Sequence, residues 1–182
     1  MTGPVLIVVA TAAEAAHVPA GLPVLVTGLG KTAAAVRTAR TLATRDLEGL
    51  TVVNIGTAGA LRPGITGLHQ PGVVINHDIN ADAVRALGHD PQERIVLDGD
   101  EDEVLASGDL FVTDPAVRDA LAGRAHLVDM EGYAVAHACR EFGVPVRLVK
   151  HISDSADETA LDWPSAVAAS AEALGHWLEQ HL

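Results

Sequence analysis

Short apolar runs alternate with amphipathic segments along the chain, and this alternation is the feature that most constrains the fold. Runs of Val, Leu and Ile bounded by Gly or Pro are typical of buried strands, whereas Ala and Leu at helical spacing indicate helices. The predicted strands are residues 5–10, 24–27, 51–56, 73–76, 94–97, 104–110, 126–130 and 144–152. The predicted helices are residues 31–47, a short helix opened by Asp114 and Pro115, and residues 132–142 and 162–182.

The composition indicates which residue types form the hydrophobic core between these strands and helices. Hydrophobic residues make up 48% of the chain but aromatic residues only 3%, so the core must consist of Val, Leu, Ile and Ala. Strands of this kind are typical of a sheet that helices cover on both faces. We therefore expect an α/β fold with three layers (αβα) and a mixed, mainly parallel central sheet. The length of 182 residues predicts a single domain over residues 1–182.

The charge excludes two classes of partner. The net charge is −12 with His neutral, whereas nucleic acids and anionic membranes are bound by clustered Lys and Arg. The only cysteine, Cys139, allows no internal disulfide. The apolar run at residues 5–10 is too short, and lacks the basic flank, for a signal peptide. No run reaches membrane-spanning length. We expect a cytoplasmic protein that binds neither nucleic acid nor membrane.

Functional sites of α/β folds lie at the carboxyl ends of the strands. This rule selects Glu14, residues 28–31, the Gly-rich segment 56–59 (expected to be a turn), Met130 with Glu131, and Ser153 with Asp154.

Two patterns that could indicate a cofactor or metal do not fit. Residues 28–32 (GLGKT) resemble the end of a phosphate-binding P-loop, but Leu25 stands where that motif needs Gly. A tight strand-to-helix turn is the expected role. His77, Asp78 and Asp82 match no standard spacing of metal ligands. We expect neither a cofactor nor a metal.

Glu131 and Asp154 each have a structural explanation when considered alone. Glu131 stands at a predicted helix start, where the helix dipole favours a carboxylate, and Asp154 follows a strand, where Asp often caps a turn. Together they suggest chemistry, because a ribose needs an acceptor for its two hydroxyls and a leaving base needs a proton.

Four segments resemble the nucleoside phosphorylase and nucleosidase superfamily, most of all its 5'-methylthioadenosine/S-adenosylhomocysteine nucleosidases. These segments are residues 54–59 (NIGTAG), 107–111 (SGDLF), 129–132 (DMEG) and 151–157 (HISDSAD). They occur in the family's order and the resemblance covers most of the chain. It implies a nucleoside phosphorylase-like fold and hydrolysis of the N-glycosidic bond of a purine nucleoside, most simply an adenine nucleoside with a modified 5' group.

The resemblance also implies roles for particular residues. Asp154 corresponds to the acid that protonates the purine near N7, and Ser153 orients it. Glu131 corresponds to the carboxylate that holds the ribose hydroxyls, with Met130 packed against the ribose. The remaining substrate-binding residues are Phe111, which stacks on the base, Val112, whose main chain contacts the base edge, and Thr57 of the Gly-rich segment.

Glu14 corresponds to the family's water-activating Glu, with an exposed acidic residue at a helix start as the alternative. Phosphorylases of the superfamily carry an Arg on the strand before the Gly-rich segment, where this chain has Asn54, and Glu14 would repel phosphate. Lys31 is the only cation near the early turns. Water is therefore the expected nucleophile, with a phosphorylase or a non-catalytic purine-binding protein as alternatives.

The chain is shorter than the usual nucleosidase. Residues 15–23 stand where family members have additional strands, and residues 80–88 resemble the family's 5'-pocket loop with Leu87 in place of an aromatic residue. The lid before the last helix is also short, and Trp163 either lines it or anchors that helix. The 5' group thus stays open between methylthio, homocysteine, 5'-deoxy and futalosine-type substituents. The resemblance further implies a homodimer whose neighbouring chain lies near the 5' pocket.

Overall fold

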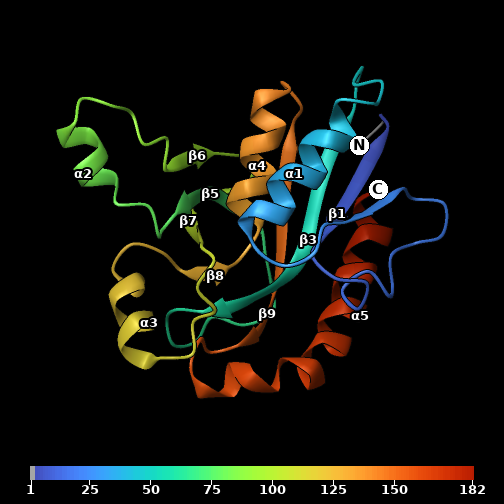
Figure 1. Ribbon diagram of the computed structural model, residues 1–182. Coiled ribbons are helices and arrows are strands. Elements are labelled where there is room, and N and C mark those ends of the chain that lie inside the picture. Colours follow the sequence, from blue (N-terminus) through green and yellow to red (C-terminus); the bar gives the residue numbers. More distant parts are fainter. Residues whose placement is uncertain (1–2) are drawn as a thin grey trace.

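A nine-stranded sheet with helices on both faces forms the centre of the molecule (Figure 1). The computed structural model describes residues 3–182, except for the side chain of Thr159. The strands are β1 (Val5–Val9), β2 (Val24–Val26), β3 (Thr51–Ala60), β4 (Leu68–His69), β5 (Pro71–Asn76), β6 (Arg94–Val96), β7 (Asp100–Ser107), β8 (Leu127–Asp129) and β9 (Val146–Asp154). The helices are α1 (Lys31–Leu42), α2 (Ala81–Ala86), α3 (Pro115–Ala122), α4 (Gly132–Glu141), the 3₁₀ helix η1 (Glu158–Asp162) and α5 (Trp163–His181).

The sheet is mixed and mainly parallel, which confirms the sequence prediction. Its strand order is β2-β1-β3-β8-β7-β5-β6, and β9 pairs with both β3 and β4. The pairs β1–β2, β1–β3, β3–β9, β5–β7 and β7–β8 are parallel, whereas β3–β8, β4–β9 and β5–β6 are antiparallel. Strand β3 pairs with three other strands and therefore brings the ends of β1, β8 and β9 to one region.

Alternating side chains of the central strands face two different helix layers, as a sheet covered on both faces requires. Leu6 and Val8 of β1 belong to the core cluster that includes residues of α1 and α4. Ile7 and Val9 belong to the cluster that contains Leu174 and other residues of α5. Figure 1 shows α1 and α4 side by side on one face and α5 against the other. The expected three-layer αβα architecture is therefore confirmed.

The Gly-rich segment 56–59 is not a turn, and that prediction is wrong. Strand β3 continues through it to Ala60 and pairs with β9 along its length, with an irregularity at Ala58 and Gly59. The glycines are explained by close approach. A Cβ at Gly56 would stand 3.1 Å from Oε1 of Glu14, and one at Gly59 would stand 2.9 Å from Oδ1 of Asp154.

Other elements also differ from the prediction. Helix α1 ends at Leu42 rather than at residue 47, and the hydroxyl of Thr44 donates to the carbonyls of Arg40 and Thr41 just beyond it. Strand β7 starts before residue 104 and ends at Ser107, which is buried and bonded to β8. Helix α2 was not predicted, although Asn80 caps it by accepting from the Ala83 N–H.

The connection between β1 and β2 contains no strand among residues 11–23, in accord with the short connection expected there. It packs against α5, where a Cβ at Gly175 would stand only 2.3 Å from the carbonyl oxygen of His17. Glycine at this helix position lets the backbones meet. Within residues 3–182, no helix combines the length and the apolar character that a membrane crossing demands.

Candidate functional site

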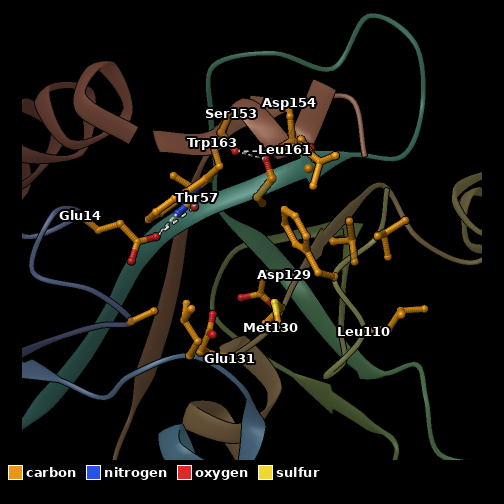
Figure 2. Close-up of a pocket in the computed structure, with 18 of the residues that line it drawn as sticks. Glu14, Thr57, Leu110, Asp129, Met130, Glu131, Ser153, Asp154, Leu161 and Trp163 are labelled. Carbon is orange, nitrogen blue, oxygen red and sulfur yellow. Dashed lines mark hydrogen bonds between the residues drawn. The ribbon is translucent and has the colours of Figure 1, made fainter. Parts of the chain in front are cut away.

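A cavity of about 430 Å³ lies beside the carboxyl ends of β1, β3, β8 and β9 (Figure 2). All eight site residues named from the sequence line it: Glu14, Thr57, Phe111, Val112, Met130, Glu131, Ser153 and Asp154. The structure therefore brings together residues that are up to 140 positions apart in the chain (Glu14 and Asp154).

Glu14 is held by four hydrogen bonds from two threonines. The side chain is 4% exposed. Its Oε2 accepts from the backbone N–H (3.0 Å) and the hydroxyl (3.1 Å) of Thr11. Its Oε1 accepts from the backbone N–H (2.9 Å) and the hydroxyl (3.0 Å) of Thr57. The carboxylate is thus fixed between the turn after β1 and the middle of β3, with its charge compensated by donors and by no direct ion pair in the described residues.

Asp154 ends β9 and lies against β3. Its Oδ2 accepts from the hydroxyl of Ser153 at 2.7 Å, and its Oδ1 accepts from the backbone N–H of Ala156 at 2.8 Å. The second bond is the turn cap expected of an Asp in this position. Because the same carboxylate also lines the cavity, the structural and the functional interpretations of Asp154 are compatible.

Glu131 precedes α4, but its side chain turns to a different helix. Its Oε1 accepts from the backbone N–H of Gly30 at 2.8 Å, beside the first residue of α1. A helix N-terminus favours a carboxylate. The side chain is 7% exposed. Burial and the nearby Asp129 raise the pKa of Glu131 to about 7, although the Gly30 N–H and Lys150 act in the opposite direction.

A buried ion pair below the cavity was not predicted. Lys150 of β9 is 2% exposed, and its Nζ lies 2.8 Å from Oδ2 of Asp129 and donates to Oδ1 of Asn54 at 2.8 Å. Asp129 also accepts from the Ser107 hydroxyl at 2.5 Å and from the Gly132 N–H at 2.9 Å. A lone Lys inside the apolar strand 144–152 was the signal that could have indicated this network.

The rest of the cavity wall is apolar, and much of it is exposed. Phe111 is 45% exposed, and the leucines Leu29, Leu110 and Leu161 are 52–70% exposed. Large apolar side chains that remain exposed around one cavity indicate a surface that a ligand covers. This wall suits a flat, largely apolar ligand.

Trp163 joins the polar and apolar parts of the cavity. It begins α5 and lines the cavity, and its indole Nε1 donates to the hydroxyl oxygen of Thr57 at 2.9 Å. Of the two alternatives expected from the sequence, the lid role is in accord with this position. The hydrogen bond to Thr57 was not predicted.

The cavity is acidic. Glu14, Asp129, Glu131 and Asp154 all line it, and no Lys, Arg or His is among the described residues that do. Lys31 does not supply the missing charge, since its Nζ pairs with Asp78 and donates to Asn76. No set of three or more His, Cys, Asp or Glu within residues 3–182 is placed to hold a metal ion.

Figure 2 shows Asp154 and Glu131 on opposite sides of the cavity, with Glu14 to one side. Such an arrangement can give a proton at one end of a ligand and accept hydrogen bonds at the other. Residues 80–88 do not contribute to this cavity. Helix α2 extends away from the body of the molecule (Figure 1), and Leu87 is 76% exposed.

Comparison with known proteins gives consistent matches. A family model described as the phosphorylase superfamily matches residues 101–179. A 5'-methylthioadenosine/S-adenosylhomocysteine nucleosidase of Marinomonas is 32% identical over 158 residues, which are 72% of this chain and 67% of the relative. An aminodeoxyfutalosine nucleosidase of Helicobacter pylori is 32% identical over 108 residues, which are 48% of this chain and 47% of the relative.

Among solved structures, a Helicobacter pylori nucleosidase mutant with 5'-methylthioadenosine in its active site has the same fold. Its TM-score is 0.84 at 24% identity, and the match covers 99% of this chain and 98% of that chain. In sequence, by contrast, the chain spans about half the length of two of the curated relatives that it matches.

Proposed function

The chain belongs to the phosphorylase superfamily, and on that premise we propose that it hydrolyses the N-glycosidic bond of a purine nucleoside. The observation that carries this proposal is one cavity that holds the carboxylates of Glu14, Glu131 and Asp154 and no basic side chain among the described residues that line it. The nucleosidase names of the curated relatives support the same activity.

In the proposed reaction, Asp154 is the acid. A protonated Asp154 carboxyl gives its proton to the purine near N7 as the bond between C1' and the base nitrogen breaks. The base then leaves as a neutral molecule instead of an anion, which lowers the barrier. The Ser153 hydroxyl, 2.7 Å from Oδ2, supports an orienting role for that residue.

Glu14 is the proposed base for the attacking water. It takes one proton as the water oxygen bonds to C1', so the reaction moves one proton from Asp154 to the base and one from water to Glu14. The two threonines that hold the carboxylate support this role by fixing its position.

The remaining residues bind the nucleoside. Glu131 accepts from the ribose hydroxyls, and Met130 packs against the sugar. Phe111 stacks on the purine, and its 45% exposure at the cavity wall supports this assignment. The main chain of Val112 contacts the edge of the base.

Water is favoured over phosphate by the charge of the cavity. A phosphate ion would have to enter among four carboxylates with no basic side chain in the described lining. The buried cation Lys150 is already paired with Asp129. A phosphorylase would need the opposite arrangement.

A base-release assay on a panel of nucleosides, with and without phosphate, tests the proposal. Hydrolysis predicts free base and free sugar at equal rates in both buffers. A phosphate requirement with formation of sugar 1-phosphate would instead identify a phosphorylase. Tight binding of adenine or nucleoside without base release would identify a binding protein.

The apolar rim of the cavity suggests the class of 5' group. Leu29, Leu110 and Leu161 favour an uncharged, apolar substituent such as methylthio over a charged one. The panel should therefore include 5'-methylthioadenosine, S-adenosylhomocysteine, 5'-deoxyadenosine, aminodeoxyfutalosine and inosine. Faster release from aminodeoxyfutalosine would favour the futalosine-type alternative.

A homodimer and a cytoplasmic location stay predictions. Light scattering coupled to size-exclusion chromatography measures the first, and cell fractionation measures the second. A monomer that hydrolyses the substrate at full rate would contradict the expected contribution of a neighbouring chain to the 5' pocket.

A further inference from the structure

Trp163 is connected to Glu14 by two consecutive hydrogen bonds. The indole Nε1 of Trp163 donates to Thr57 Oγ1 at 2.9 Å, and the same hydroxyl donates to Oε1 of Glu14 at 3.0 Å. Figure 2 shows the three side chains in this order along one side of the cavity. They come from the turn after β1, from β3 and from the start of α5.

The chemistry of the groups fixes the direction of this chain of hydrogen bonds. An indole N–H can only donate, whereas a hydroxyl has one proton and two acceptor lone pairs. The indole therefore takes one lone pair of Thr57 Oγ1 and leaves its proton to Glu14. Hydrogen bonds in a series also polarise one another, so the first should strengthen the second.

Of the four donors to Glu14, only the two hydroxyls can rotate. The backbone N–H groups of Thr11 and Thr57 are fixed by the turn and by β3. The hydroxyl of Thr11 accepts from the backbone N–H of Glu14 at 3.3 Å, so it is restrained within its own turn. The hydroxyl of Thr57 is restrained by Trp163, which lies 106 positions away in the chain.

We propose that Trp163 is a positioning residue that orients Glu14 through the hydroxyl of Thr57. This inference rests on the proposed role of Glu14 as the base. It also means that the start of α5, whose residues Trp163 and Pro164 line the cavity, is coupled to the base. An apolar anchor for α5 would need only the indole ring and not its N–H.

Replacing the indole by a ring without a donor separates these two roles. In Trp163→Phe the apolar wall is kept and the N–H is lost. Loss of one such hydrogen bond should lower kcat roughly fivefold, with KM within about twofold of the wild type. Trp177→Phe is the matched control, because Trp177 lies on the buried face of α5, is 5% exposed and does not line the cavity. It should lower the unfolding temperature and leave kcat unchanged.

A double-mutant cycle with Thr57→Val shows whether Trp163 acts through Thr57. In the Thr57→Val background, Trp163→Phe should have no further effect on kcat. In the Thr57→Ser background, which keeps the hydroxyl, Trp163→Phe should still lower kcat. Additive losses in the Thr57→Val background, or an unchanged kcat in Trp163→Phe, would overturn the inference.

A readout independent of turnover separates this inference from the proposed function. The chain has two tryptophans, so the indole N–H signal of Trp163 in a ¹H–¹⁵N spectrum is assigned by its absence from Trp163→Phe. Thr57→Val and Glu14→Gln should both displace this signal. An unmoved signal overturns the coupling even if the wild type releases base. If the wild type releases no base from any nucleoside, the proposed function is overturned, and the signal still decides whether the coupling exists.

Discussion

The carboxylate of Asp154 occupies the space that a side chain at Gly59 would need. A Cβ built on Gly59 would stand 2.9 Å from Oδ1 of Asp154, closer than real Cβ contacts allow. The same relationship holds at the other end of the segment, where a Cβ on Gly56 would stand 3.1 Å from Oε1 of Glu14. Two glycines of one strand thus make room for both carboxylates that the proposed reaction uses as acid and base.

Gly59→Ala should displace Asp154 and lower activity without preventing folding. The new methyl group would also meet Val128 and Ala156 at 3.1–3.2 Å, so the carboxylate has little space to retreat. Such overpacking costs about 1–3 kcal/mol of stability. A displacement of the acid by about 1 Å should lower kcat roughly a hundredfold.

Steady-state kinetics and thermal unfolding check this prediction. Gly123→Ala is the matched control, because its Cβ would meet its nearest neighbour at an ordinary 3.7 Å and its φ is −68°. This variant should resemble the wild type in both measurements. Full activity in Gly59→Ala would contradict a close fit between β3 and Asp154.

Asp154→Asn should nearly abolish base release while leaving the fold intact. The amide oxygen can still accept from the Ala156 N–H, which Asp154 does at 2.8 Å. The amide cannot give up a proton as an acid does, so kcat should fall by about 10²–10⁴-fold. Asp119→Asn, on the exposed surface of α3, should leave kcat unchanged.

Adenine binding provides the second measurement for this variant. If Asp154→Asn still binds adenine but does not release it from a nucleoside, the loss belongs to the chemical step. Unchanged turnover would remove Asp154 from its proposed role.

Period and strand-end position predicted most of the fold and the composition of the site. The apolar run at residues 5–10 was sufficient to predict a buried strand, and the structure places Ile7 and Val9 on one face of the sheet and Leu6 and Val8 on the other. Since the carboxyl ends of neighbouring strands meet, Glu14 and Asp154 could be expected near each other from their position after strands alone.

The Gly-rich segment of β3 could not be understood from its own residues. Glycines such as Gly56 and Gly59 are typical of turns. Here they are needed for another reason, since the carboxylates of Glu14 and Asp154, which are far away in sequence, pack against them. The ion pair of Asp129 and Lys150 was missed for a similar reason. Each residue has a local explanation, and only the sheet shows that their charges meet.

Glu131 should make the stability of the protein depend on pH near neutrality. Its pKa is raised from 4.5 to about 7, chiefly by burial. The folded protein therefore keeps a proton that the unfolded chain releases, and the free energy of unfolding falls as pH rises from about 4.5 to 7. Glu131→Gln removes this dependence. Between pH 4 and pH 8, the free energy of unfolding of the variant should rise by on the order of 3 kcal/mol relative to that of the wild type.

Urea unfolding across this pH range measures the effect. Glu172→Gln, an exposed position on α5, is the control and should follow the wild-type curve. In the same range, KM of the wild type should rise as pH falls below about 7, because a protonated Glu131 accepts less well from the ribose hydroxyls. Parallel stability curves for Glu131→Gln and the wild type would contradict the raised pKa.

Lys150→Met should be strongly destabilising, because it leaves Asp129 as a buried charge without its cation. Removing one partner of a buried ion pair costs about 3–5 kcal/mol, and here both side chains are at most 2% exposed. Arg147→Met on the same strand is the matched control. Its pair with Asp98 is largely exposed, and such pairs contribute at most about 1 kcal/mol.

A second substitution separates the effect of the unpaired Asp129 charge from the effect of the packing contacts that Lys150→Met removes. Asp129→Asn removes the stranded charge. Its single amide oxygen can still accept from the Gly132 N–H, while its NH₂ group faces the Ser107 hydroxyl, which can accept as well as donate. In the Lys150→Met background it should therefore recover a part of the lost free energy of unfolding, measured by urea titration. If Asp129→Asn adds a further loss to that of Lys150→Met, the charge of Asp129 is not what Lys150 compensates, and the cation serves Glu131 or Glu14 instead.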